Sequence, residues 1–361
     1  MIPVTKPFLP PKEEVYALLD EVWNRQWLTN NGPLVNKLEL MLKEYLGVPH
    51  LLYLNNGTIA LQIAIKALDL KGEIITTPFS YVATTSSIMW EGCNPVFVDI
   101  DSNTLNIDPA KIEAAITPET SAILATHVYG NACDIDAIQM IADKHKLKVI
   151  YDAAHCFGTL YKGKSVFAYG DISTTSFHST KLFHTVEGGA VFTMKPDLLK
   201  KMAYLRNFGH DGPENFEEVG INGKNSEFHA AMGLCNLKYI EDIKKSRRAQ
   251  SEQYSKRLFN SSIKFIEINT HCSFNYAYYP IVLENEQLLH KVITELEANW
   301  VKPRRYFYPS LNTVPIFKTG NPLEVSENIA KRVLCLPLYH SLSFEEIDFI
   351  SRILLRALNK K

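Results

Sequence analysis

Short apolar runs alternate with amphipathic segments over the first two thirds of the chain. Segments such as PAKIEAAI and DIDAIQMIADKHK have a helical period; in the second, Ile135, Ile138 and Ile141 follow Asp134, a candidate N-cap. The alternation predicts an α/β fold in which helices cover both faces of a mostly parallel sheet. The runs that predict strands are EIITTP near residue 73, NPVFVDID near 94, SAILATHVYG near 121, KLKVIYDAAH near 146, DISTTSF near 171 and GGAVFT near 188.

The pattern changes after about residue 240. The charged stretch EDIKKSRRAQSEQYSKRL predicts one long, solvated helix that links two domains. Short strand-like pieces (IKFIEI and YAYYPIVL) and a final helix from about Phe344 follow it, which is typical of a small α+β domain. We therefore expect a large domain over residues 1–245 and a small C-terminal domain over residues 246–361.

The composition narrows the class of protein. Of the 361 residues 46% are hydrophobic, and the net charge of -1 provides no basic field for nucleic acid, although a local site for one small anion is still compatible with it. The six cysteines include no C-x-x-C pair, which is typical of reduced thiols in a cytoplasmic protein. The N-terminus lacks a signal-peptide pattern, and no apolar run approaches the ~20 residues of a membrane span. We expect a cytoplasmic protein without membrane or nucleic-acid partners.

Two residues at predicted strand ends are candidates for a catalytic site, because ligands bind at the carboxyl ends of strands in open parallel sheets. Asp152 ends the strand KLKVIYD, and Lys181 lies a few residues after the strand DISTTSF, before a Gly-Gly pair. A buried carboxylate is costly unless it meets a cation or several donors. An acid and a lysine on neighbouring strands are what Schiff-base chemistry on a pyridine ring requires: the acid keeps the ring nitrogen protonated, and the lysine carries the aldehyde. Taken singly, Asp152 could instead be a helix N-cap and Lys181 a surface lysine.

Two further motifs could bind the rest of such a cofactor. LNNGTIALQIAIKAL reads as a turn into an apolar helix, with Gly57 allowing close approach of the backbone and Thr58 offering a hydroxyl at the helix N-terminus, where anions bind. The alternative is an ordinary turn with Thr58 as its cap. In TTPFSYVATT, Phe79 and Tyr81 follow a strand and could lie flat on a planar ring, or could belong to the core.

Together these motifs resemble the sugar aminotransferases of the DegT/DnrJ/EryC1/StrS family. The resemblance runs from WLTNNGPLV (27–35) through NNGTIAL, TPFSYVATTSS, PVFVDID, HVYG, YDAAHCFG, SFHSTK, EGGAV and INGKNSEFHAAMGL to CLPLYHSL (335–342). It implies the fold-type-I, aspartate aminotransferase-like architecture, pyridoxal 5'-phosphate as cofactor, and a homodimer.

The resemblance also implies a role for individual residues. Lys181 becomes the lysine that binds the cofactor's aldehyde carbon, Asp152 the partner of the pyridinium nitrogen, and His155 the neighbour of the phenolic oxygen. The family's N-x-R-M loop reads Asn222-Gly223-Lys224-Asn225 here, without its arginine. The other cofactor residues implied are Gly57, Thr58 and Ser176 for the phosphate, Tyr81 for ring stacking, and Asn222 contributed by the neighbouring subunit.

Candidate substrate residues are Thr29, His178, His184 and Tyr306. His178 and His184 either line a sugar pocket or pack in the interior. A zinc site built from these two histidines and Cys156 has no supporting ligand spacing, so we expect no metal.

The expected reaction is transfer of an amino group from L-glutamate to a dTDP-linked 4-keto-6-deoxyhexose, giving dTDP-4-amino-4,6-dideoxyglucose for deoxyamino sugar and O-antigen biosynthesis. Family members that aminate carbon 3 tend to read like SFYPGKNLGALGDGG, whereas this chain has bulkier residues around Lys181 and VEGG after it. Alternatives are a 3-aminotransferase for 3-keto-6-deoxyhexoses and a catalytically silent regulatory protein. A same-fold dehydratase would carry histidine in place of Lys181, and a nicotinamide dehydrogenase would need a G-x-G-x-x-G motif after the first strand.

Overall fold

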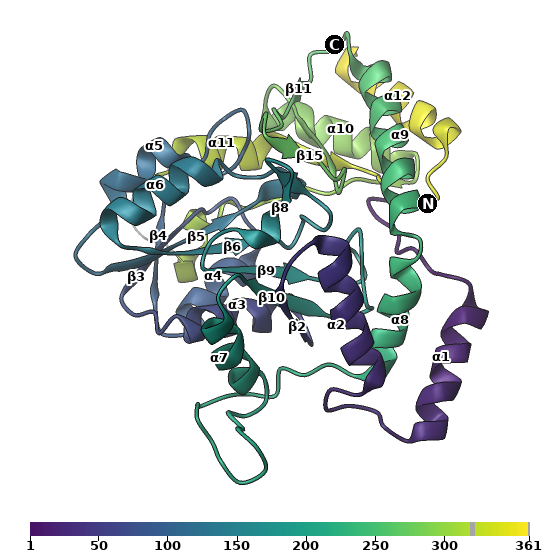
Figure 1. The fold of residues 1–361 in the computed structure, drawn as a ribbon. Coiled ribbons are helices and arrows are strands. Elements are labelled where there is room, and N and C mark those ends of the chain that lie inside the picture. The colour runs from purple at the N-terminus through teal and green to yellow at the C-terminus, as the bar shows by residue number, and fades with distance from the viewer. Residues whose placement is uncertain (318–321, 360–361) are drawn as a thin grey trace.

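The computed structural model describes residues 1–317 and 322–359 of the chain. A seven-stranded sheet with the order β2-β10-β9-β6-β5-β3-β4 forms its centre (Figure 1). Strand β10 is antiparallel to both of its neighbours, and the other adjacent pairs are parallel. The mostly parallel sheet is therefore confirmed. Its strands are His50–Leu54 (β2), Glu73–Thr76 (β3), Asn94–Phe97 (β4), Thr120–Thr126 (β5), Lys148–Asp152 (β6), Ile172–Ser176 (β9) and Gly189–Thr193 (β10).

Helices cover both faces of this sheet. On one face Leu38 of α2, Ile138 of α6 and Ala231 of α8 share a buried cluster with alternate strand residues such as Ile75. The residues between them, such as Ile74, point to the other face and pack with α3, α4 and α7. As predicted, Asp134 caps α6, and its side chain accepts a hydrogen bond from the backbone N–H of Ala137. The helices of this part are Lys12–Arg25 (α1), Pro33–Leu46 (α2), Gly57–Ala67 (α3), Val82–Trp90 (α4), Pro109–Ile112 (α5), Ile135–His145 (α6), Pro196–Arg206 (α7) and Glu227–Leu237 (α8).

The long helix α9, Ile240–Leu258, is only partly solvated, contrary to the prediction from its charged sequence. Arg247 and Gln250 are buried on one face, where Arg247 donates a hydrogen bond to the carbonyl of Ala277 and Gln250 to that of Leu342. These two side chains hydrogen-bond to backbone carbonyls instead of to solvent water. One face of the helix can therefore pack against the C-terminal elements. The predicted domain boundary between residues 245 and 246 falls within α9 and stays a prediction.

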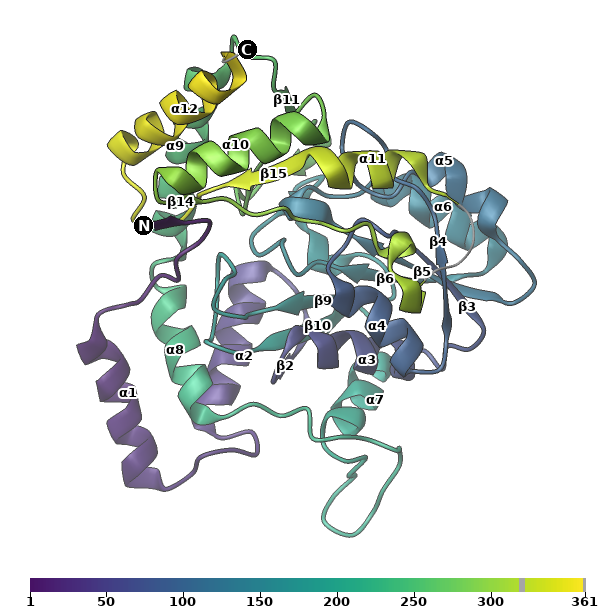
Figure 2. The ribbon, with the colours of Figure 1, turned by 180° about the vertical axis from the view of Figure 1, so that it is seen from behind.

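The C-terminal elements form a second, smaller core beside α9. A three-stranded antiparallel sheet with the order β11-β13-β15 packs with α10 and α12. The N-terminal strand β1 pairs in parallel with β14, so the N-terminus lies beside β14 and α12 (Figure 2). The elements are Ile2–Pro3 (β1), Lys264–Phe265 (β11), Tyr279–Val282 (β13), Glu286–Ala298 (α10), Val301–Lys302 (β14), Glu324–Arg332 (α11), Val333–Leu336 (β15) and Phe344–Asn359 (α12); a small separate sheet contains Leu160–Tyr161 (β7), Lys164–Ser165 (β8) and Cys272–Ser273 (β12).

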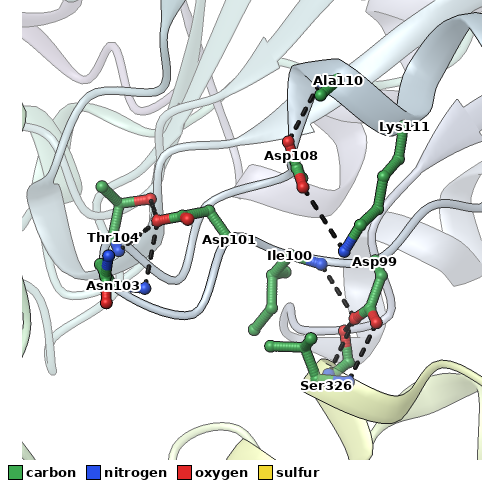
Figure 3. Close-up of polar contacts among 10 residues, drawn as sticks. Asp99, Ile100, Asp101, Asn103, Thr104, Asp108, Ala110, Lys111 and Ser326 are labelled. Atoms are coloured by element: carbon green, nitrogen blue, oxygen red, sulfur yellow. Dashed lines mark hydrogen bonds and ion pairs between the residues drawn. The ribbon is translucent and has the colours of Figure 1, made fainter.

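A buried carboxylate joins the central sheet to α11 (Figure 3). Asp99, just after β4, accepts hydrogen bonds from the backbone N–H groups of Val325 at 2.9 Å and Ser326 at 2.8 Å, and from the Ser326 hydroxyl. The N-cap residue of α11, Leu323, makes no side-chain cap, so Asp99 supplies it from a distant part of the chain. Burial alone would raise the pKa of Asp99, but the hydrogen bonds from Ser326, Val325 and Ile100 outweigh it and lower that pKa.

The opposite end of α11 reaches the segment 304–307. The guanidinium of Arg305 lies 3.4 Å from the carbonyl of Ala330 and 3.3 Å from that of Lys331, at the last turn of the helix. Helix α11 therefore connects the edge of the central sheet to a segment that lines the cavity described next. In the described parts of the chain, no helix has the length and apolar character needed to cross a bilayer.

Candidate active site

A cavity of about 260 Å³ lies at the carboxyl ends of β6 and β9, against the N-terminus of α3. Most of the residues predicted for the site line it, although they come from segments far apart in the sequence. The predicted residues that line the cavity are Gly57, Thr58, Tyr81, Asp152, His155, Ser176, His178, Lys181 and Tyr306. Thr29, His184 and Asn222 do not line it.

Lys181 lies on a turn after β9, where its backbone N–H donates to the carbonyl of His178 at 2.9 Å. No hydrogen bond joins its side-chain amine to another described residue. Burial lowers the pKa of this amine to about 8, and the charge of Arg304 acts in the same direction, while the charge of Asp152 opposes it. The amine therefore loses its proton, and becomes nucleophilic, at a much lower pH than an ordinary lysine.

Asp152 presents a buried carboxylate at the end of β6. Its Oδ2 accepts a hydrogen bond from the hydroxyl of Thr84 at 2.7 Å, and its Oδ1 accepts one from the backbone N–H of Ala154 at 3.1 Å. Burial raises the pKa of Asp152, whereas the bond from Thr84 and the charge of Lys181 act against that rise. Because it has donors but no paired cation among the described residues, the carboxylate can still bind a protonated ring nitrogen.

The hydroxyl of Thr84 belongs to a short buried network. The Ser80 hydroxyl lies 2.7 Å from that of Thr84 and 3.0 Å from that of Thr126. Ser80 is 2% and Thr126 4% exposed, so these hydroxyls hydrogen-bond to one another and not to solvent. The network fixes which way the Thr84 hydroxyl points and therefore supports the bond to Asp152.

His155 is held in one tautomer. Its Nδ1 accepts a hydrogen bond from the backbone N–H of Tyr129 at 3.2 Å, so in the neutral ring the proton is on Nε2. Burial lowers the pKa of His155 well below its ordinary value, which keeps the ring neutral. Phe307 stacks on it with a centroid distance of 5.7 Å and an interplanar angle of 7°. A neutral ring with Nε2–H is a fixed donor, which suits a phenolic oxygen.

The N-terminus of α3 forms a cradle of free donors. Asn56 rather than Thr58 caps the helix, and its side chain accepts from the backbone N–H of Ile59 at 2.8 Å. The Thr58 hydroxyl is thus left for a ligand, as are the first N–H groups of the helix, which have no partner in the helical ladder. A Cβ on Gly57 would lie 2.8 Å from Cβ of Ser176, so only glycine lets the helix approach Ser176 this closely. The cradle has the donors and the shape for a phosphate group.

Of the two aromatic candidates for ring stacking, Phe79 belongs to the core and Tyr81 lines the cavity. Phe79 is fully buried, so the core interpretation holds for it, whereas Tyr81 is 54% exposed and lines the cavity. Tyr306 also lines it, with the guanidinium of Arg304 4.4 Å from its ring centroid. A flat ligand bound above Asp152 has aromatic surface available to it from Tyr81.

Three predicted residues lie elsewhere. His184 is buried, with Nε2 2.7 Å from the carbonyl of Phe8, so it packs in the interior and does not line a sugar pocket. Thr29 is exposed, and its carbonyl accepts a hydrogen bond from the indole of Trp27. Asn222 lies on the long loop between α7 and α8; it does not line the cavity, and its carbonyl accepts a hydrogen bond from the side-chain amide of Asn55 at 3.2 Å, just before the cavity-lining Asn56.

Two charged residues of the cavity were not among the sequence candidates. Glu187 and Arg304 both line it. Glu187 could have been singled out because it lies between Lys181 and the Gly188-Gly189 pair. Arg304 carried no such signal, because it reaches the cavity from a segment whose position depends on α11 and β15, where its backbone pairs with Cys335.

The cavity fits pyridoxal phosphate: a phosphate cradle, a buried carboxylate for the ring nitrogen, a donor for the phenolic oxygen and a reactive lysine surround one space. Fold and site thus define an aspartate aminotransferase-like enzyme with this cofactor, as predicted. The profile of the DegT/DnrJ/EryC1/StrS aminotransferase family matches residues 11–354, and the chain belongs to this family.

Relatives match over nearly the whole chain. The sequence is 44% identical to a dTDP-4-amino-4,6-dideoxy-D-glucose transaminase of Shigella dysenteriae, over 96% of each chain. It is 40% identical to an Escherichia coli protein of the same name, over 98% of each. Among solved structures, DesI with its TDP-sugar product is 33% identical with a TM-score of 0.94, covering 99% of this chain and 93% of that one. Helicobacter pylori PseC, an aminotransferase of pseudaminic acid biosynthesis, is 26% identical with a TM-score of 0.90, over 99% of each chain.

Proposed function

We propose that the protein transfers the amino group of L-glutamate to carbon 4 of dTDP-4-keto-6-deoxyglucose, giving dTDP-4-amino-4,6-dideoxyglucose. The observation that carries the chemistry is the meeting of Lys181 and Asp152 in one cavity beside the phosphate cradle. The two transaminases of S. dysenteriae and E. coli, which match from end to end, support the choice of substrate. Aminotransferases of this family act on a nucleotide-linked sugar with an amino donor; glutamate and the dTDP group are the finer part of the proposal.

The residues divide the work as follows. When bound, pyridoxal phosphate supplies the electron sink that makes a proton on the donor's α-carbon removable. The Asp152 carboxylate, which Thr84 orients through its hydrogen bond to Oδ2, would keep a proton on the ring nitrogen. Lys181 Nζ holds the cofactor between turnovers, then takes the proton from the α-carbon of the donor and later returns one to the sugar carbon.

Other residues hold the cofactor in place. Nε2–H of His155 would donate to the phenolic oxygen, and Tyr81 would pack against the ring. The hydroxyls of Thr58 and Ser176 and the first N–H groups of α3 would donate hydrogen bonds to the cofactor's phosphate, and the helix dipole would favour the negative charge.

We also propose a homodimer in which Asn222 of each chain completes the phosphate site of the other. Helix α1 and the loop between α7 and α8 extend outward from the rest of the chain (Figure 1). Both carry large apolar side chains that are exposed in the single chain and would be covered in a dimer. These are Tyr16, Trp23, Phe208, Phe216 and Val219.

A complementation experiment tests the shared site. Lys181→Ala and Asn222→Ala chains, each impaired alone, are mixed under conditions of proven subunit exchange. Some mixed dimers then have one site with both residues, so part of the activity should return. No recovery after exchange would contradict the shared site.

The reaction is tested with purified protein, glutamate and candidate ketosugars. We expect turnover of dTDP-4-keto-6-deoxyglucose, with the 4-amino product identified by NMR and a low kcat/KM on the 3-keto isomer. A preference for the 3-keto isomer would move the proposal to a 3-aminotransferase. Failure of the protein to bind cofactor, seen as the lack of a visible absorption band, would instead favour a catalytically silent protein.

A further inference from the structure

A strained residue precedes Glu187 in the wall of the cavity. Val186 has φ of 68°, in the left-handed region that a β-branched residue rarely adopts. Its backbone N–H donates to Nδ1 of His184 at 3.2 Å, and the carbonyl of Glu187 accepts from the Thr185 hydroxyl at 2.7 Å and from the Asn225 amide at 3.0 Å. The surrounding structure therefore imposes this conformation, and its consequence is the direction in which Glu187 leaves the backbone.

Glu187 and His178 lie side by side in the cavity wall. Oε1 of Glu187 is 3.5 Å from Nε2 of His178, and their side chains are 52% and 43% exposed. Nδ1 of His178 accepts the backbone N–H of Thr180 at 3.2 Å and lies 2.8 Å from the Thr180 hydroxyl, which can donate to it; in this arrangement Nε2 carries the proton of the neutral ring. The turn that holds His178 also holds Lys181, whose N–H donates to the His178 carbonyl. His178 is thus held on the same turn as the reactive lysine.

The two polar atoms are close enough for one ligand atom beside them to contact both. Their separation of 3.5 Å exceeds the 2.7–3.2 Å of an N–H···O hydrogen bond. A carboxylate acceptor next to an imidazole N–H donor complements a hydroxyl group, which both donates and accepts. The negative charge of Glu187 disfavours the amino donor, which itself carries carboxylates.

We propose that Glu187 and His178 form the subsite that binds a ring hydroxyl of the hexose next to its reacting carbonyl. This inference rests on the proposed function, in which the amino acceptor is a ketosugar. The subsite would align the sugar with the amine beside Lys181, because His178, Lys181 and Glu187 lie close together in the chain and line the same cavity. It would also favour the sugar over the amino donor, although both substrates enter that cavity.

The test separates the two halves of the reaction. The loss of the visible cofactor band on adding glutamate reports the first half, and its return on adding ketosugar reports the second. Glu187→Gln keeps the size of the side chain but removes its charge. We expect kcat/KM of the sugar half to fall about tenfold or more, as for a lost hydrogen bond to a charged group, while the glutamate half is unchanged or faster. Glu297→Gln, at an exposed site on α10, is the matched control and should leave both halves unchanged.

A sugar analogue without the hydroxyl next to the carbonyl allows a double-mutant type of cycle, in which the variant and the analogue each remove the same hydrogen bond. On this analogue Glu187→Gln and His178→Ala should cost much less than on the full ketosugar, because the bond they remove is already missing. Equal slowing of both halves, selective loss of the glutamate half, or an undiminished penalty on the analogue would each overturn the subsite. Absence of any reaction of the wild-type protein with ketosugar, with a normal glutamate half, would overturn the proposed acceptor and the subsite with it.

Discussion

The hydroxyl of Thr84 donates a 2.7 Å hydrogen bond to the carboxylate of Asp152, although the two residues are 68 positions apart. Both are buried, and the Ser80 hydroxyl fixes Thr84 in turn. Burial favours the neutral form of Asp152, whereas its proposed role requires the anion. The bond from Thr84 is one of the features that favour the anion.

Thr84→Val should therefore weaken cofactor binding, most strongly in acid. Removing a donor that lowers the pKa of Asp152 raises that pKa further, so the carboxylate is protonated at higher pH and the acid limb of cofactor retention moves upward. We expect the cofactor dissociation constant at pH 7 to rise about tenfold. Absorbance titrations at several pH values measure it.

Thr85→Val is the matched control for Thr84→Val. Thr85 is the next residue of α4, and its hydroxyl is buried but makes no hydrogen bond to the described residues. The control should bind the cofactor as the wild type does. Equal weakening in both variants would mean that helix packing, rather than the bond to Asp152, is responsible.

Lys181 should titrate far below an ordinary lysine. Since burial lowers its pKa from 10.5 to about 8, the neutral amine appears as the pH rises through about 8. In cofactor-free protein, the pH dependence of labelling with an amine-selective reagent should have its midpoint there, as followed by peptide mass spectrometry. In Asp152→Asn the midpoint should move lower, because the charge of Asp152 raises this pKa. A midpoint near 10.5 would contradict the buried environment.

Gly57→Ala should push α3 away from Ser176. The new Cβ would lie 2.8 Å from Cβ of Ser176, and overpacking of this kind typically costs about 1–3 kcal/mol. We expect a lower melting temperature and at least about tenfold weaker cofactor binding, since the donors of the cradle move. In the double variant Gly57→Ala/Ser176→Gly the clash with that Cβ is gone, so stability should recover while cofactor binding, which lacks the Ser176 hydroxyl, should not. Recovery of neither would contradict the contact.

Asp99→Asn should loosen α11 from the central sheet. The amide keeps one acceptor oxygen, whereas its NH2 group faces backbone donors, so we expect a loss of about 1–2 kcal/mol in the free energy of unfolding at pH 7. Denaturant titration measures it, with the exposed Asp20→Asn as control.

The pH dependence of this loss has a definite sign. Because the folded-state pKa of Asp99 lies below its ordinary value of 3.8, its contribution is complete above that value and is lost as the pH falls through the lowered pKa. The difference between wild type and Asp99→Asn should therefore shrink in acid. A difference that does not change with pH would mean that shape rather than charge matters at this position.

Much of the architecture followed from local pattern. Apolar runs predicted six strands of the central sheet, and Asp152 and Lys181 were found because each ends or follows such a run, whereas Ser176 was implied only by the family resemblance. The strand His50–Leu54 was not predicted, since its five residues merge with the turn before α3. The charged helix α9 was expected to be solvated, because a sequence pattern cannot reveal that Arg247 and Gln250 find backbone acceptors on other elements.

By itself, then, the sequence determined the period of each element, the order of the strands along the chain and the residues at their ends, because these depend on interactions between near neighbours. Only the tertiary structure decided that Thr84 meets Asp152, that His184 packs while His178 lines the cavity, and that Arg304 and Glu187 share it. The burial, charge and hydrogen bonds of these side chains come from segments up to hundreds of residues away, such as the 226 positions between Asp99 and Val325. Local pattern carries no information on which remote donors and acceptors meet once the core has packed.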